Sequence, residues 1–291
     1  MNIMQQLRAP LFVSLLAPPL LFVLVLFFME RTEAQDVLTV TFLDVGQGDA
    51  ILIESPAGIQ VLIDGGKGGD VLAALNQELG FFDRDIDMVL ATHADADHIG
   101  GLVDVLKQYT VGVIVMTENE SDSPVYDAFM HAVALEGATT ITARAGQTYD
   151  LGSGSAGSTT LSVLFPDYNP EGLASNTASI ITQLSYGRIA YMLTGDAPEE
   201  IESYLATREG VELRSDVLKL GHHGSNTSTS DEFLNVVQPR IGIISAGKDN
   251  SYGHPHAAVL ERLTAHGVPY KNTADEGSIV SQSDGVEIWF R

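Results

Sequence analysis

Two imidazoles and two carboxylates occur close together in the first half of the chain. These four side chains lie within six residues: His93, Asp95, Asp97 and His98. The segment follows the apolar run 87–92, which predicts a buried strand, and precedes 99–106, which predicts the start of a helix. If the backbone stays extended, alternate residues share one side, whereas the two adjacent residues 97 and 98 must point differently. Histidine and carboxylate ligands are typical of Zn²⁺, Mn²⁺ and iron sites. The spacing therefore favours two neighbouring metal sites over a solvated acidic turn.

Two later strand ends supply the ligand types that this segment lacks. Asp196 follows a predicted strand over 189–193, and His222 and His223 follow another over 216–220. Two tetrahedral ions need about four ligands each, so a bridging carboxylate and a further histidine are required. We expect Asp196 and His222 to provide them. Adjacent residues at a strand end point apart, so His223 is expected just outside the metal shell.

Polar residues near these strand ends could bind substrate or orient a ligand. Lys219, Ser225, Asn250 and His254 carry groups that donate to phosphate or carboxylate oxygens, although His254 could instead begin a helix. Asp64 ends the predicted strand 60–63 and could either form a turn or orient a ligand histidine.

The elements that must position these residues alternate between β-rich and mixed regions. Strands are expected at 37–45, 51–53, 60–63, 87–92, 111–116, 139–143, 148–151, 159–165, 179–186, 189–193, 216–220, 241–245 and 286–290. Helices are expected at 70–79, 99–109, 124–135, 198–207, 229–237 and 256–266, and a flexible loop at 152–158. This order predicts an α/β (α+β) fold of two packed sheets with helices outside each, rather than one twisted parallel sheet.

The N-terminal residues differ in character from the rest. The nineteen residues 11–29 are apolar apart from Ser14 and follow Arg8, so they could span a bilayer as a signal anchor. The alternative is a signal peptide cleaved before Gln35. We therefore expect a leader at 1–35 and one folded domain at 36–291. The domain would lie outside the cytoplasm, held by the membrane segment or secreted after cleavage.

Charge and cysteine content limit the possible functions. The 291 residues carry a formal charge of −23 and no cysteine. Disulfides and thiolate ligands are therefore excluded, and any metal must be held by His, Asp or Glu. The acidity argues against a broad nucleic-acid groove, but bound divalent ions can reverse the local field for a phosphodiester.

Six motifs in order resemble one known domain. They are Leu43-Asp44-Val45-Gly46-Gln47-Gly48-Asp49-Ala50, Ile63-Asp64-Gly65-Gly66, His93-x-Asp95-x-Asp97-His98-x-Gly100-Gly101, Thr194-Gly195-Asp196, Lys219-x-x-His222-His223-Gly224-Ser225 and Tyr252-Gly253-His254-Pro255. Together they resemble the metallo-β-lactamase-fold domain of ComEC-type DNA-uptake proteins.

The resemblance implies a four-layer αββα sandwich with a dinuclear metal site at one edge. It also implies metal ligation by His93, Asp95, Asp97, His98 and Asp196, with His222 as the last ligand. The broader superfamily usually has histidine at the position of Asp95, whereas the ComEC-like group has aspartate. A further superfamily histidine has no counterpart here except polar residues near Asn176.

The expected activity is hydrolysis of an anionic phosphodiester, such as DNA, RNA or a nucleotide. Two divalent ions, Zn²⁺ or Mn²⁺, would activate a water that Asp97 orients or deprotonates. His223, Lys219, Ser225 or His254 would bind the substrate anion or protonate the leaving group. The alternatives are a lactone, lactam or other ester hydrolase of the same fold and a non-catalytic extracytoplasmic metal-binding module. The sequence leaves the oligomeric state open.

Overall fold

A computed structural model describes residues 36–80 and 82–291. The predicted membrane segment, residues 11–29, lies outside this described part of the chain. Among the described residues, no helix is long and apolar enough to cross a bilayer. Residues 36–291 form one compact unit.

The first sheet has eight strands, in the order β15-β14-β1-β2-β3-β4-β5-β6. Their bounds are β1 (Leu38–Phe42), β2 (Ile51–Glu54), β3 (Gln60–Ile63), β4 (Asp85–Ala91), β5 (Thr110–Met116), β6 (Thr139–Thr142), β14 (Ile279–Ser283) and β15 (Ile288–Phe290). The pairs from β3 to β6 are parallel, whereas the pairs from β15 through β14, β1 and β2 to β3 are antiparallel. Every residue of β1 is buried, as expected for a strand covered on both faces.

The second sheet has seven strands, in the order β13-β12-β11-β10-β9-β8-β7. Their bounds are β7 (Thr148–Gly154), β8 (Gly157–Phe165), β9 (Ile181–Tyr186), β10 (Ile189–Leu193), β11 (Val217–Lys219), β12 (Ile241–Ile244) and β13 (Tyr270–Asn272). From β10 to β13 the strands are parallel, so their carboxyl ends lie at one edge.

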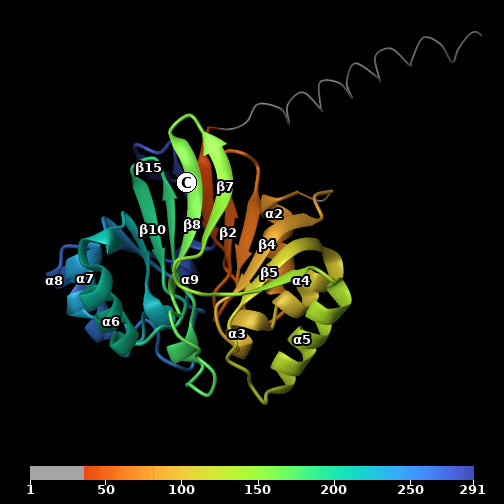
Figure 1. Ribbon diagram of the computed structural model, residues 1–291. Helices are drawn as coiled ribbons and strands as arrows, with labels where there is room; N and C mark the ends of the chain where they lie inside the picture. The colour runs from red at the N-terminus through yellow and green to blue at the C-terminus, as the bar shows by residue number, and fades with distance from the viewer. Residues whose placement is uncertain (1–35, 81) are drawn as a thin grey trace, which may run out of the picture. The chain divides into compact units, whose positions relative to one another are not determined.

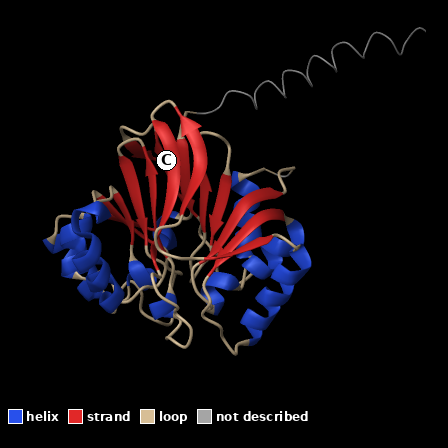
Figure 2. Ribbon diagram, in the orientation of Figure 1, coloured by secondary structure: helices blue, strands red, loops and turns tan. Residues whose placement is uncertain are grey.

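Helices cover the outer face of each sheet (Figures 1 and 2). The first sheet carries α2 (Asp70–Glu78), α3 (Ala96–Ile99), α4 (Leu102–Gln108) and α5 (Pro124–Glu136), and the second carries α6 (Glu199–Glu209), α7 (Asp231–Val237) and α8 (Ala257–Ala265). Short elements are α9 (Thr273–Glu276) and the 3₁₀ turns η1 (Asn176–Ala178), η2 (Gly210–Leu213) and η3 (Gly221–Gly224). One apolar core lies between the sheets and two lie beneath the helices. The predicted αββα sandwich is confirmed.

Local signals explain the ends of the longest helix, α5. The Ser123 side chain accepts a hydrogen bond from Tyr126 N at 3.2 Å, and Pro124 occupies the first turn, where its missing N–H costs nothing. The helix ends at Gly137, whose φ of 71° is easily adopted only without a side chain.

Three expectations about elements were wrong. The segment 152–158 is not a flexible loop, because β7 and β8 continue to Gly154 and Gly157, and only two residues connect them. The predicted helix 99–109 is divided into α3 and α4 at Gly100 and Gly101, which pack tightly on the segment after β3. The strand β13 was not predicted, because its sequence Tyr-Lys-Asn has no alternating apolar pattern.

Candidate metal centre

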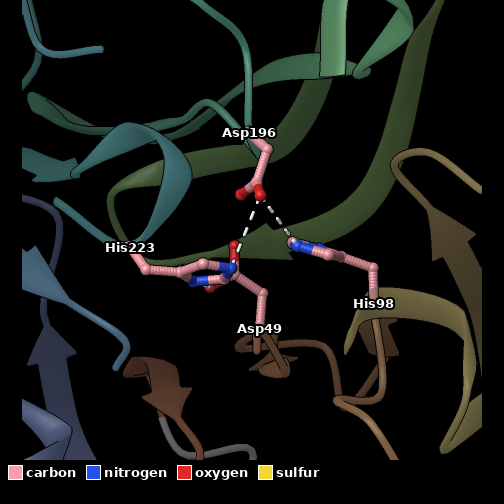
Figure 3. Close-up of side chains that lie close together, drawn as sticks. All are labelled: Asp49, His98, Asp196 and His223. Carbon is pink, nitrogen blue, oxygen red and sulfur yellow. Dashed lines mark ion pairs between the residues drawn. The ribbon is translucent and has the colours of Figure 1, made fainter. Parts of the chain in front are cut away.

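Four buried side chains meet at the edge where strands of both sheets end (Figure 3). Asp49 comes from the β1–β2 loop, His98 from α3, Asp196 from the turn after β10 and His223 from η3. One ligand atom of each lies within 4.8 Å of the others. His98 Nε2 is 3.3 Å and His223 Nε2 is 3.4 Å from Asp196 Oδ2. This mixture of imidazoles and carboxylates is a ligand set for a divalent metal ion.

The Asp196 carboxylate is the common neighbour of the histidines. Its Oδ2 atom is also 3.9 Å from His93 Nε2 and 3.8 Å from His222 Nε2. Four imidazoles therefore face one carboxylate oxygen, while Asp196 Oδ1 is buried without a hydrogen-bond partner.

The two other acids of the central segment lie at the rim of the centre. Asp95 Oδ2 is 3.7 Å from His93 Nε2, and Asp97 Oδ2 is 3.5 Å from His223 Nε2. Their side chains are 43% and 27% exposed, whereas those of His93 and His223 are buried. Burial raises the pKa of Asp97, but the interactions with His223 and His98 outweigh burial and lower it. Asp97 is thus an ionised carboxylate within reach of solvent.

Unpaired polar atoms test whether these residues suit a metal ion. Five buried atoms of the cluster have no hydrogen-bond partner: Asp49 Oδ1, His93 Nε2, His98 Nε2, Asp196 Oδ1 and His223 Nε2. Leaving such an atom unsatisfied costs about 1–3 kcal/mol, so a folded protein rarely gathers several at one point. All five are atoms of the types that ligate metals, and they belong to side chains gathered around Asp196. The residues present therefore fit a divalent cation.

A hydrogen-bond chain from Asp64 sets the tautomers of two histidines. Asp64 accepts from Thr92 N at 2.8 Å, from Thr92 Oγ1 at 2.7 Å and from His98 Nδ1 at 2.8 Å. Because Thr92 Oγ1 gives its proton to Asp64, it must accept from His93 Nδ1, 2.9 Å away. Both Nδ1 atoms are therefore protonated, which leaves Nε2 as the metal-ligating atom of each ring. The orienting role expected for Asp64 has the geometry that it requires.

The remaining histidine of the cluster is oriented by the backbone. His223 Nδ1 donates to the carbonyl oxygen of Ser245 at 2.9 Å, which again leaves Nε2 as the ligating atom. Burial lowers the pKa of His223, but the carboxylates of Asp196 and Asp49 outweigh burial and raise it to about 9. Burial and the charge of His98 instead lower the pKa of His93 to about 4. Burial likewise lowers the pKa of His98, but Asp196 and Asp64 outweigh burial and raise it. Metal binding at neutral pH therefore requires His223 and His98, but not His93, to release a proton.

The outcome for His222 and His223 differs from the prediction. The two residues do point apart, but His223 faces the cluster and His222 lies at the rim with a 29% exposed side chain. Both have positive φ, 49° and 56°, and this left-handed turn reverses the orientation expected from an extended strand end. His222 Nδ1 is 3.1 Å from Thr227 Oγ1, and the Asn176 amide nitrogen lies 3.4 Å from both of its ring nitrogens.

Asp49 was missed by the sequence reasoning, and Lys219 was given the wrong role. Lys219 is fully buried and forms an ion pair with Asp49, so it does not reach substrate. The available signal was a lysine within an apolar strand, which needs a buried acidic partner. A second signal was Gly48, whose φ is 135° and whose added Cβ would lie 2.2 Å from the Asp97 carbonyl oxygen. This contact places the Asp49 loop against α3.

Two other predicted substrate contacts differ in the structure. Asn250 donates to the carbonyl oxygens of Gly247 and His254 and accepts from His254 N, so its amide closes its own loop. Ser225 is 4% exposed, and its hydroxyl is 3.0 Å from Thr227 Oγ1. Both side chains therefore shape the loops around the centre and are not presented to a ligand.

His254 lies where the prediction placed it, beside the cluster. Its ring centroid is 5.5 Å from that of His222 and 6.1 Å from that of His223. Burial and the charges of His223 and His222 lower its pKa to about 4, so it is neutral at pH 7. Its contact with substrate stays a prediction.

Comparisons with known proteins place this geometry in a family. The profile of the metallo-beta-lactamase superfamily matches residues 43–248. The chain is 31% identical to "ComE operon protein 3" of Bacillus subtilis over 82% of its length, and 30% identical to "Competence protein ComA" of Neisseria gonorrhoeae over 87%. It covers 32% and 34% of those two proteins, so it spans about a third of the curated relatives that it matches. The metallo-beta-lactamase fold protein YhfI of Bacillus subtilis has a TM-score of 0.57 at 13% identity, with 86% of this chain and 100% of that chain covered.

Proposed function

The chain belongs to the metallo-β-lactamase superfamily, whose members are generally hydrolases, and from that premise we propose that it is a metal-dependent phosphodiesterase. The substrate class is an anionic phosphodiester in DNA, RNA or a nucleotide. The observation that carries the proposal is the set of five unpaired ligand atoms around Asp196. Cations held at this site would give an otherwise acidic molecule a local positive charge that attracts a phosphodiester.

The residues that would hold two ions, Zn²⁺ or Mn²⁺, surround Asp196. They are Asp49, His93, Asp95, Asp97, His98, Asp196, His222 and His223. Such ions supply Lewis-acid charge to the phosphate oxygens and make water more acidic. The oxygen-rich set, with four carboxylates, moves the preference from Zn²⁺ toward Mn²⁺.

The chain's own groups provide the proton transfer and the substrate contacts. Asp97 is ionised and partly exposed, so it can accept the proton of an attacking water. His223 is buried and its Nε2 atom is the ligating atom, so it does not reach the leaving group. His222 and His254 stand at the rim, where ring N–H groups can donate to phosphate oxygens.

Turnover of a substrate panel tests the proposal. We expect the purified protein with Mn²⁺ or Zn²⁺ to hydrolyse bis(p-nitrophenyl) phosphate or an oligonucleotide. Asp97→Asn should slow turnover by about a hundredfold or more. Asp104→Asn is the matched control, because it removes an exposed carboxylate on the neighbouring helix that is paired with Lys107. Turnover of a lactam or lactone alone would assign the alternative chemistry, and no turnover by metal-loaded protein would indicate a binding module.

We also propose that the domain is held at the outer face of a membrane by residues 11–29. The support is the nineteen-residue apolar run after Arg8. Fractionation of cells expressing the full chain tests this. Intact protein confined to the soluble cytoplasmic fraction would contradict it.

A further inference from the structure

Three arginines converge on one pocket at the edge of the second sheet opposite the metal centre. Arg188, Arg214 and Arg240 line a pocket of about 300 Å³ with Asp216, Ser215 and Gln238, and with Ala190 and Val237. Arg188 lies in the β9–β10 turn, and Arg214 and Arg240 precede β11 and β12. Because these strands are parallel, their amino ends lie together, at the far end from Asp196 and His223.

The backbone fixes the three arginines side by side. Asp216 N donates to Ala190 O, and Arg240 N donates to Asp216 O, each at 2.8 Å, which joins the starts of three neighbouring strands. Arg188 N donates to Gly285 O at 2.6 Å. The Arg214 carbonyl oxygen accepts from Gln183 Nε2 at 3.2 Å. The backbone positions of the three arginines are therefore fixed by the hydrogen bonds of the sheet and its turns.

The charge of this pocket is opposite to that of the molecule. The chain has 38 acidic residues against 15 lysines and arginines, yet three of those 15 line one pocket. Asp216 is the sole acidic residue among the lining residues, and its Oδ1 atom is 3.5 Å from Arg240 Nη1. Among the described residues, Arg188 and Arg214 form no ion pair with a carboxylate. Two guanidinium groups are thus held near a third without a counter-charge, in a protein rich in carboxylates.

From this arrangement we propose that the pocket binds the phosphate group of a small anionic ligand. Guanidinium groups match phosphate oxygens with paired, charge-assisted hydrogen bonds. The volume is at the lower end of the roughly 300–1,000 Å³ that is usual for small-molecule sites. A bound phosphate would supply the counter-charge that Arg188 and Arg214 lack. The pocket is separate from the metal centre, so the proposal does not rest on the phosphodiesterase activity.

Two sources could supply the phosphate, a soluble phosphate ester or a phospholipid headgroup. The charge of the pocket suits both sources equally, and the pocket lies at the edge where the described part of the chain begins, at Asp36. The carbonyl oxygen of Asp36 accepts from the hydroxyl of Tyr186 at 3.3 Å, and Tyr186 lies two residues before Arg188. Both sources present the same phosphate chemistry to the arginines.

Calorimetric titration of the full chain in a non-ionic detergent, with EDTA present to empty the metal centre, tests the proposal. The probes are inorganic phosphate, a mononucleotide, and dihexanoyl phosphatidylglycerol below its micellar concentration. We expect Arg188→Gln and Arg214→Gln to weaken binding by about tenfold to a hundredfold. Lys248→Gln is the control, because it removes one exposed cation at the metal-centre edge. Binding of the nucleotide alone would assign a soluble ester, and binding of the lipid alone a headgroup.

Two results would overturn the proposal. One is the absence of binding by the wild-type chain at about 10 mM of every probe, well above a 1 mM dissociation constant. The other is binding that Lys248→Gln weakens and the two arginine variants do not. Loss of phosphodiester turnover is not among these results, so failure of the proposed activity and failure of this pocket are distinguished.

Discussion

At the scale of single residues, the histidine pair after β11 allows a direct test of the metal centre. His223 Nε2 is buried 3.4 Å from Asp196 Oδ2, whereas His222 lies at the rim with other partners. We predict that His223→Ala loses bound metal, because a buried ligand is removed and the Asp196 carboxylate loses one of its imidazole neighbours. His222→Ala should retain more metal. Elemental analysis after identical metal loading measures the metal content of both variants. A greater loss of metal in His222→Ala than in His223→Ala would restore His222 as the inner ligand.

Asp64 offers a test of tautomer control. In Asp64→Asn one oxygen becomes an NH₂ group, which donates where His98 Nδ1 and Thr92 Oγ1 now donate. His98 would then carry its proton on Nε2, the atom that faces the metal. We expect metal affinity to fall by about 10- to 100-fold, the usual effect of losing such a partner. Competition with a chromophoric chelator measures the metal affinity of the wild-type chain and of the variant. Unchanged affinity would show that the ring orientation does not depend on Asp64.

Residue types and spacing predicted much of this site, and local backbone geometry explains what they missed. His93, Asp95, Asp97 and His98 could be recognised because four ligand types crowd into one strand end. Asp49 was missed because the glycines around it are equally typical of an ordinary turn. The choice between His222 and His223 depends on two successive non-glycine residues with positive φ, which no sequence pattern indicates.

At the scale of elements, the junction of α3 and α4 holds the metal segment against the Asp64 turn. An added Cβ at Gly101 would lie 1.9 Å from the Gly65 carbonyl oxygen and 2.6 Å from that of Gly68. We therefore predict that Gly101→Ala lowers the free energy of unfolding by about 1–3 kcal/mol or more. Gly68→Ala is the matched control, since its Cβ would meet nothing within 4 Å. Urea denaturation measures the free energy of unfolding of both variants. Equal values would contradict the close packing of Gly101 on the segment after β3.

A buried acid in α6 supports the loop between η3 and α7. Glu202 is fully buried, and its oxygens accept from Thr229 N at 2.6 Å and Ser230 N at 2.8 Å. Burial raises its pKa from 4.5 to about 7, although the two backbone hydrogen bonds oppose the shift. The folded state therefore holds a proton that the unfolded chain has lost above pH 4.5. The stabilisation that this proton provides is complete below pH 4.5 and is lost as the pH rises to 7. Above pH 7, Glu202 causes no further change in stability.

The pH dependence of Glu202→Gln tests this argument. Between pH 5 and pH 8 the wild-type chain should lose stability relative to the variant, by roughly 2–3 kcal/mol for a shift of this size. Urea denaturation at several pH values measures the difference, in which the other titrating groups cancel. Parallel curves for the two proteins would show that Glu202 does not titrate in this range.

At the scale of the whole molecule, the order of apolar segments predicted the layers but not the closure of the first sheet. The parallel strands β3 to β5 and the helices between them follow from alternating apolar and helical patterns. The pairing of β1 with β14, more than 230 residues away, does not, because a short strand carries no record of its distant partner. Tyr191 Oη, 2.8 Å from Ser281 Oγ, then ties this strand to the second sheet.

Net charge leads to a prediction about ionic strength. A molecule of charge −23 repels a polyanion until it is close to the metal centre, where the cations reverse the local field. Salt at 0.1 M screens charges beyond about 10 Å, so it removes the long-range repulsion and affects the close contacts less. We therefore expect kcat/KM for a long oligonucleotide to rise, by about threefold or more, between low and moderate salt at constant metal concentration.

A dinucleotide substrate is the control for this prediction, because it carries little charge beyond the reacting phosphate and should respond weakly. The opposite trend, a fall in kcat/KM for the long substrate as salt rises, would mean that cationic side chains on the surface guide the polymer. The three arginines opposite the metal centre would then be the first residues to test for that role, since Arg188→Gln and Arg214→Gln should abolish the salt dependence if they contact the polymer.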